Sequence, residues 1–240
     1  MVRTRVALLI WALMAVVRVA RADGLWREEE PQKRRSAEAY RRKLRQVLLG
    51  DERAPLCQLM TVPSSAPERA VYMVRKMGTK DVTVASRTVK QSVWGQMMRE
   101  LRTAGPGGSW RFDADSMRAT LDRMRVEVTG REAALDADAA ERVSELCRDI
   151  LEDAQRVPPK DGGLDGVSYH ATHWLPGGML AGQTWSPAKN TIAAEFIAVE
   201  ETLRAYAEAS QAARPKLRTD LLERSKHVRE RLRAERARKP

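Results

Sequence analysis

Residues 163–187 read GLDGVSYHATHWLPGGMLAGQTWSP, a stretch that stands out for its turn residues and its aromatic side chains. Residues 167–174 and 179–185 favour two strands, and Pro176-Gly177-Gly178 between them has the composition of a tight turn. Asp165-Gly166 suits a turn that needs a positive φ. We therefore predict a β-hairpin, which Ser186-Pro187 separates from a following helix.

The alternation of side chains in the first strand divides this segment into two surfaces. One face is expected to carry Val167, Tyr169, Ala171 and His173, and the other Ser168, His170, Thr172 and Trp174. Trp185 has two interpretations: it packs in the core under the following helix, or it belongs to an aromatic binding surface. The candidate binding residues are Tyr169, His170, His173, Trp174 and Trp185.

The rest of the chain mixes strands and helices without a regular βαβ alternation. Helices are expected over residues 36–49, 93–101 and 113–123, and from 216 onward. Two more are expected, one from Asp136 or Asp138 to about 155 and one from Asn190 or Thr191 to about 213. Further strands are expected over residues 71–77 and 82–89, and in an alternating run from Met124 to Val128. The prolines at positions 55, 63 and 67 are expected to break up the stretch between the first helix and these strands. This pattern predicts an α+β fold with a mostly antiparallel sheet packed with helices.

The N-terminus has the features of a secretory signal. A basic start precedes the twelve-residue apolar run VALLIWALMAVV, and Ala20-Arg21-Ala22 offers small residues for cleavage before Asp23. A helix of twelve residues rises about 18 Å, which is short of the roughly 30 Å hydrocarbon core. The alternatives are an uncleaved anchor and a buried N-terminal helix. We expect a periplasmic or extracellular bacterial protein, cleaved near Ala22, whose mature chain does not span a membrane.

Charge is concentrated at the two ends of the chain. The net charge of +11 comes from the signal segment and the C-terminal segment, whereas residues 23–213 carry equal numbers of basic and acidic residues. A neutral body and export both argue against nucleic acid as a partner. We expect a signal peptide (1–22), a linker with an N-terminal helix (23–50), an α+β domain (51–213) and a basic helical tail (214–240).

The basic tail is expected to be an exposed helix that Pro215 sets off from the body. Five arginines crowd its end: Arg229, Arg231, Arg233, Arg236 and Arg238. One interpretation is a solvated helix that docks a thin apolar stripe on the body. The other is electrostatic contact with an anionic envelope surface or an acidic partner.

The chain has two cysteines, Cys57 and Cys147. In an oxidising compartment they make one possible disulfide. Alternatively both are free thiols, and Cys147 fills the buried face of its helix.

No catalytic or metal motif is strong. His170 and His173 lie three residues apart, so on a strand they point to opposite faces and cannot share a metal ion. Either histidine could serve as base for Ser168 or Ser186, but Ser186 is explained better as a turn residue before Pro187. We expect no cofactor and no metal.

The sequences Leu164-Asp165-Gly166 with Tyr169, and Gly182-x-Thr184-Trp185-Ser186-Pro187, carry a resemblance. Residues 163–207 resemble a C-terminal segment of uncharacterised small secreted or periplasmic bacterial proteins, in which a DG turn leads into a hairpin, a Ser-Pro and a helix. The resemblance implies a secreted α+β domain and no activity.

These observations predict a non-catalytic binding module of the bacterial cell envelope. Its expected partner is an envelope protein or an anionic envelope surface. The alternatives are a periplasmic immunity-type inhibitor of a toxin and a small envelope hydrolase that uses His170 or His173.

Overall fold

The computed structural model describes residues 26–27, 35–50, 55–76, 78–103, 114–154, 166–176 and 178–238. The expected signal peptide, residues 1–22, lies outside the described residues.

The centre of the fold is one antiparallel sheet with the strand order β1-β7-β6-β2-β3-β4-β5. Its strands are β1 (Trp26–Arg27), β2 (Cys57–Pro63), β3 (Arg69–Arg75), β4 (Val82–Val89), β5 (Val128–Leu135), β6 (Val167–Leu175) and β7 (Gly178–Trp185). Every neighbouring pair is antiparallel. The predicted α+β class is confirmed, and so are the hairpin, which is β6–β7, and the strands β3 and β4.

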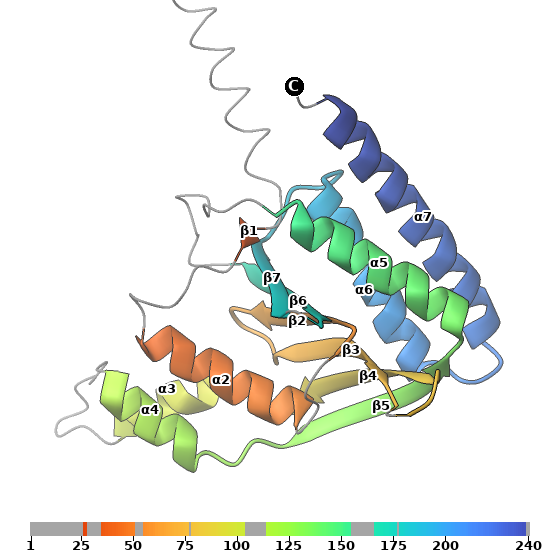
Figure 1. The fold of residues 1–240 in the computed structure, drawn as a ribbon. Helices are drawn as coiled ribbons and strands as arrows, with labels where there is room; N and C mark the ends of the chain where they lie inside the picture. Colours follow the sequence, from red (N-terminus) through yellow and green to blue (C-terminus); the bar gives the residue numbers. More distant parts are fainter. Residues whose placement is uncertain are drawn as a thin grey trace, which may run out of the picture.

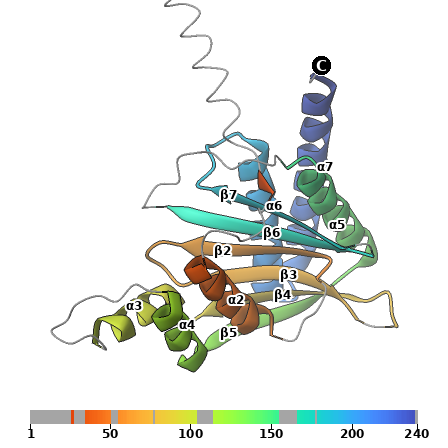
Figure 2. The same ribbon diagram turned by 60° about the vertical axis from the view of Figure 1, so that its left-hand side comes forward.

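Helices cover both faces of the sheet (Figures 1 and 2). The helices are α2 (Arg35–Leu49), α3 (Val93–Thr103), α4 (Ala114–Arg123), α5 (Ala137–Glu152), α6 (Ile192–Glu208) and α7 (Arg214–Arg238). Helices α5 and α6 pack on one face, and α7 packs on the outside of both. Helices α2, α3 and α4 lie on the other side, where α2 contacts β3 and β4.

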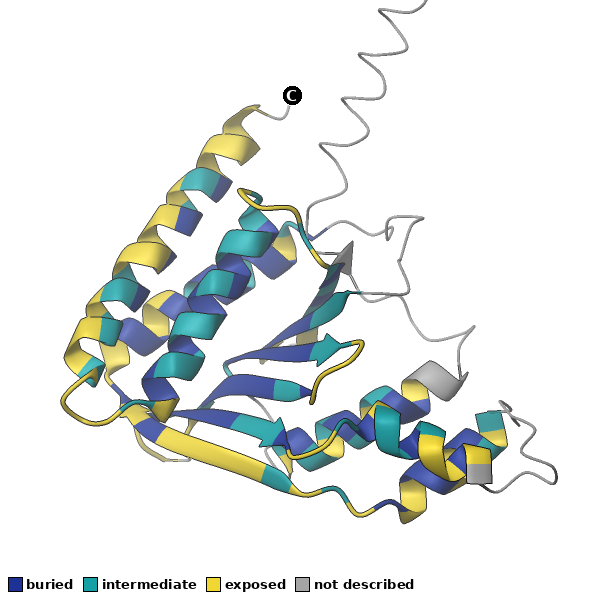
Figure 3. Cartoon of the chain, turned by 180° about the vertical axis from the view of Figure 1, so that it is seen from behind, coloured by how far each residue is buried: buried dark blue, intermediate teal, exposed yellow. Residues whose placement is uncertain are grey.

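Alternation along the strands produces two separate cores. Leu59 of β2 and Val71 of β3 belong to the larger core with α5, α6 and α7. Met60 and Tyr72, their neighbours in sequence, belong to the smaller core with α2, α3 and α4. Figure 3 shows the resulting pattern: the buried residues lie along the sheet and on the sides of the helices that face it.

Helix ends follow local sequence signals. The Asp136 carboxylate accepts a hydrogen bond from the Ala139 N–H at 3.1 Å, and the Thr191 hydroxyl accepts one from the Ala194 N–H at 3.2 Å. Gly50, at φ +60°, ends α2, and its N–H donates to the Gln46 carbonyl at 3.0 Å. Of the alternative starts predicted for α5 and α6, Asp136 and Thr191 are the N-caps, and the predicted end of α2 is confirmed.

Two strands differ from the prediction. β2 occupies a stretch in which prolines argued for irregular structure, but Pro63 is the last residue of the strand and therefore interrupts no pairing. The alternating run from Met124 to Val128 is not a strand. β5 begins only at Val128, and its exposed residues 129–132 lie at the sheet edge, where no apolar alternation is required.

The last helix also differs from the prediction. It begins at Arg214, with Pro215 in its first turn, where the missing N–H of proline costs no hydrogen bond. Leu221, Val228 and Leu232 are at most 3% exposed and belong to the larger core. The α7 helix therefore docks its apolar stripe on the body, which is the first of the two interpretations of the tail, and Pro215 does not set it off from the body.

Candidate functional site

The β6–β7 hairpin distributes the predicted binding residues over two faces. Tyr169 and Ala171 pair with Thr184 and Gly182 on the face that packs against α5. Trp174 pairs with Met179 on the opposite face. The predicted division of the first strand into two faces is therefore confirmed, and the five candidates do not form one continuous surface.

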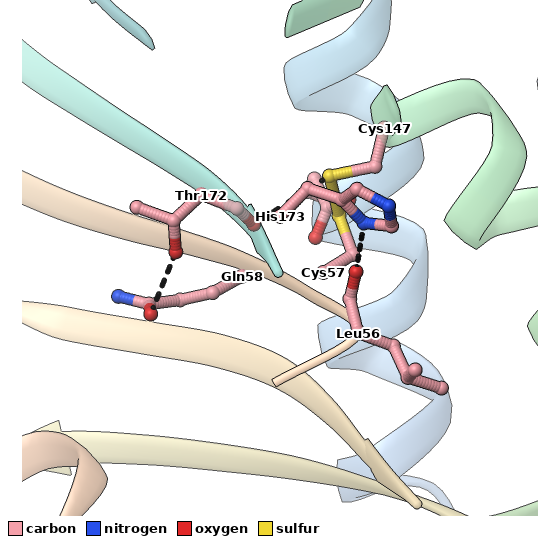
Figure 4. The surroundings of a disulfide bond; sticks show 7 residues. Leu56, Cys57, Gln58, Cys147, Thr172 and His173 are labelled. Atoms are coloured by element: carbon pink, nitrogen blue, oxygen red, sulfur yellow. Dashed lines mark hydrogen bonds between the residues drawn. A yellow bond between two sulfur atoms is a disulfide. The ribbon is translucent and has the colours of Figure 1, made fainter. Parts of the chain in front are cut away.

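His170 and His173 are both buried and lie on opposite faces of β6. The His173 Nδ1–H donates to the Leu56 carbonyl (Figure 4). Burial lowers the pKa of His173, and the nearby Arg148 lowers it further, so the imidazole is neutral at physiological pH. Within the described ranges, no group of three His, Cys, Asp or Glu residues is placed to hold a metal ion.

Ser186 has a structural role at the end of β7. Its Oγ accepts a hydrogen bond from the Val167 N–H at 2.9 Å, and its backbone has φ +34°. The hydroxyl thus closes the base of the hairpin, as a turn residue does.

Trp185 does not pack in the core beneath α6. It is half-buried and pairs with Ser168. Its indole lies against Gly166, where an added Cβ would come within 2.6 Å of the ring. The core interpretation of Trp185 is wrong because the last residue of β7 falls on the face of the sheet opposite α6. Gly166 leaves room for the ring, so the tryptophan packs against the base of its own hairpin.

The tip of the hairpin exposes two large apolar side chains. Trp174 and Met179 face each other across the strands and are 41% and 42% exposed. Trp94 of α3, 39% exposed, also projects into solvent, but its ring has an edge-on contact with Tyr40 at 5.5 Å between centroids. We call Trp174 and Met179 the apolar tip.

Most of the basic residues predicted as a binding surface are ion-paired. Three arginines of α7 bind acids on α5, on the C-cap of α5 and on α6: Arg229 binds Glu145 and Asp149, Arg236 binds the C-cap Asp153, and Arg231 binds Glu195. Arg233 and Arg238 are exposed. Three of the five arginines are therefore paired with acids of the body and hold α7 in place. This pairing weakens the case for an electrostatic binding surface at the end of α7.

Cys57 and Cys147 form a disulfide between the start of β2 and α5, with Cα atoms 6.1 Å apart (Figure 4). Both cysteines are fully buried. Closing a loop with a sequence separation of 90 residues stabilises the fold by on the order of 4 kcal/mol in the chain-entropy account. Of the two sequence alternatives, the structure has the disulfide. Such bonds are typical of oxidising compartments.

A pocket of about 460 Å³ opens between the C-terminal end of α2 and strands β3 to β5. Arg87 crosses this pocket over Gly130, where an added Cβ would come within 2.2 Å of the arginine Nη1. The guanidinium forms a salt bridge with Glu132. Because that charge is already paired, we assign no ligand to the pocket.

Sequence reasoning missed two buried carboxyl groups. Glu68 binds the N-terminus of α3, and Glu200 lies inside the larger core beside the disulfide. A signal for Glu200 existed: it falls at helical spacing between the buried residues Phe196 and Leu203. Glu68 has no such local signal because its donors lie 24 to 28 residues away in sequence.

Comparisons of the chain with protein-family models, curated proteins and solved structures find no match.

Proposed function

We propose that this protein is an exported, non-catalytic binding protein of the bacterial cell envelope, and that it binds an envelope protein through the apolar tip. The observation that carries the proposal is the exposure of Trp174 and Met179 as a facing pair on a paired hairpin. The disulfide supports export because it needs an oxidising compartment to persist. In the part of the chain that is described, no helix has the length and apolar character needed to cross a bilayer.

The energetics favour a protein partner for the apolar tip. Tryptophan is enriched among the residues that dominate protein–protein binding energies, and methionine is also enriched at interfaces. Both side chains project from paired strands, so little backbone entropy is lost when a partner covers them. An anionic surface has less support because Arg229, Arg231 and Arg236 are already paired with acids of the body.

The hydrolase alternative receives less support from the geometry. The His173 imidazole is buried and bonded to the Leu56 carbonyl, and the Ser186 hydroxyl is bonded to the Val167 N–H. The two groups also lie at opposite ends of the hairpin, because His173 pairs with Leu180 near the tip and Ser186 is at the base, so they do not form a base–nucleophile pair. An immunity-type inhibitor remains a form of the proposed binding function, in which the partner is a toxin.

The test compares two exposed tryptophans. Mature protein with Trp174→Ala and mature protein with Trp94→Ala are immobilised and used to capture partners from the envelope fraction of the source organism. We expect Trp174→Ala to weaken capture of the partner at least about tenfold, as for a residue that dominates an interface, and Trp94→Ala to leave it unchanged. Circular dichroism checks that both variants fold. Equal capture by the wild type and the folded Trp174→Ala variant would refute the proposed site.

A further inference from the structure

Glu200 is a carboxyl group enclosed in the larger core. It lies in the middle of α6 and is fully buried. Its Oε1 is 3.3 Å from the Cys57 Sγ, and its Oε2 has no hydrogen-bond partner among the described residues. A buried carboxylate without a donor is strongly unfavourable, so this arrangement needs a physical explanation.

Among the described residues, no cation forms an ion pair with Glu200. Its neighbour Glu201 binds Arg69 of β3 at 2.7 Å and Arg204 at 2.8 Å, so both arginines are already used. Of the charged groups near the disulfide, Arg148 and Glu152 of α5 act on His173 instead. Burial raises the pKa of Glu200 to about 8, and the negative charge of Glu201 raises it further.

The contact between Glu200 and Cys57 changes its chemistry with the oxidation state. In the disulfide, the Cys57 sulfur carries no hydrogen. A hydrogen bond across the 3.3 Å between Cys57 Sγ and Glu200 Oε1 therefore requires a proton on the Glu200 carboxyl group. In the dithiol form, Cys57 carries an S–H at the same place, and a thiol can donate to a carboxylate. The Glu200 carboxylate therefore has a hydrogen-bond donor only when the disulfide is reduced.

We propose that Glu200 accepts the proton of the Cys57 thiol when the disulfide forms, so that oxidation of the Cys57–Cys147 pair and protonation of Glu200 occur together. This inference does not depend on the binding function proposed above. This coupling explains why the oxidised core contains a carboxyl group without a hydrogen-bond donor: its donor, the Cys57 thiol, exists only in the reduced protein.

The oxidant is a disulfide on another molecule, and the step balances as follows. Both cysteines are fully buried in the folded protein, so this exchange takes place while the core is locally open. Cys57 gives its proton to Glu200, and the resulting thiolate attacks the external disulfide, which releases one thiolate. Cys147 then loses its proton, attacks the Cys57 sulfur and releases the second thiolate. Two electrons pass to the external disulfide. The two released thiolates become thiols: one takes the proton that Cys147 lost, and the other takes a proton from water. Because the Cys57 proton stays on Glu200, oxidation takes up one proton from water overall.

The first test is the equilibrium between the full-length protein and dithiothreitol at a series of pH values. The protein dithiol and dithiothreitol are both mostly protonated between about pH 6 and pH 8. Unless another group titrates with the reaction, the equilibrium constant between them is therefore independent of pH in this range. With Glu200 linked, the equilibrium constant for protein oxidation falls as pH rises, by up to about tenfold per unit. We expect this slope in the wild type and a flat profile in Glu200→Gln. A flat wild-type profile would overturn the proposal.

The second test keeps Glu200 and changes only the donor. Cys147→Ala retains the Cys57 thiol, whereas Cys57→Ala removes it, and both variants lack the disulfide. Infrared absorption by the protonated carboxyl, assigned with Glu200→Gln, should be present at pH 7 in the oxidised wild type and in Cys57→Ala, and lost in Cys147→Ala. Equal absorption in the two alanine variants would overturn the proposal. So would their failure to fold, because the proposal requires a folded state in which the disulfide is absent.

Discussion

Arg218 of α7 forms a two-bond ion pair with Asp136. The arginine Nε lies 2.6 Å from Oδ2 of the carboxylate, and Nη2 lies 2.9 Å from Oδ1. The same carboxylate accepts the hydrogen bond from the Ala139 N–H that begins α5. One side chain therefore fixes the start of α5 and attaches the first turns of α7 to it.

The two roles of Asp136 can be separated by substitution. Asp136→Asn keeps an oxygen for the Ala139 N–H but loses the ion pair, which is solvent-exposed and therefore contributes little to stability. Asp136→Ala also loses the cap and should destabilise the protein by about 1 kcal/mol more. Urea unfolding at neutral pH measures both changes. Equal losses in the two variants would show that the cap contributes nothing.

The ion pair also predicts a dependence on acid. Its hydrogen bond with Arg218 is the main cause that lowers the pKa of Asp136 below its ordinary value of 3.8. The stabilisation is therefore present above pH 3.8 and is lost as pH falls through the lower pKa of the folded state. The difference in stability between the wild type and Asp136→Asn should shrink in strong acid. A difference that stays constant would contradict this assignment.

Leu221 tests whether α7 is part of the core. It is fully buried, whereas its neighbour Leu222 is only half-buried. Leu221→Ala should destabilise the protein by about 2–5 kcal/mol, the usual cost of such a truncation in a core, and Leu222→Ala should cost clearly less. Chemical denaturation compares the two variants directly. Loss of less than about 1 kcal/mol for Leu221→Ala would favour the exposed tail that the sequence suggested.

Local signals explain what the sequence predicted correctly. The hairpin follows from its turn residues, and α5 and α6 begin at Asp136 and Thr191, whose side chains bond to backbone a few residues away. Alternation placed His170 and His173 on opposite faces, which excluded a shared metal ion. Each of these features depends on residues that are close in sequence.

Features that depend on distant residues were not predictable in the same way. The charge-rich sequence of α7 favoured an exposed helix, but its arginines meet acids on α5 and α6 that lie 36 to 84 residues away. One interpretation placed Trp185 in the core because it precedes a helix, yet Gly166, before the first strand at the base of the hairpin, receives its ring. The sequence alone does not decide whether the two cysteines pair, because it is the packing of α5 on β2 that brings their Cα atoms to 6.1 Å from each other.

Glu68 joins three elements of the smaller core. Its buried carboxylate accepts hydrogen bonds from the Tyr40 hydroxyl at 2.5 Å, the Ser92 hydroxyl at 3.0 Å, and the N–H groups of Val93 and Trp94 at 2.9 and 3.2 Å. The two N–H donors belong to the first turn of α3, where negative charge also interacts favourably with the helix dipole.

Removal of this carboxylate should leave several donors without an acceptor. We expect Glu68→Ala to destabilise the protein by about 3 kcal/mol, because buried groups lose charge-assisted bonds. Tyr40→Phe removes one donor but keeps the carboxylate bonded to the others, so about 1–2 kcal/mol is expected. Thermal or urea unfolding measures both. If Tyr40→Phe costs as much as Glu68→Ala, the contacts with α3 contribute little.

Glu200 predicts that the oxidised protein loses stability as the solution becomes more alkaline. Burial raises the pKa of Glu200 from an ordinary value of 4.5 to about 8, so the unfolded chain releases this proton at lower pH than the folded chain does. Below pH 4.5 the acid is neutral in both the folded and the unfolded chain and adds no pH-dependent cost, and stability falls as pH rises from there to about pH 8. The loss over this window is on the order of 4 kcal/mol.

Glu200→Gln cannot ionise and should remove this component of the pH dependence. Denaturant midpoints of the oxidised wild type and of Glu200→Gln, measured from pH 5 to pH 8, give the comparison. Parallel curves would mean that Glu200 does not carry a buried proton, whereas curves that diverge with rising pH, with the variant becoming the more stable protein, would show that it does.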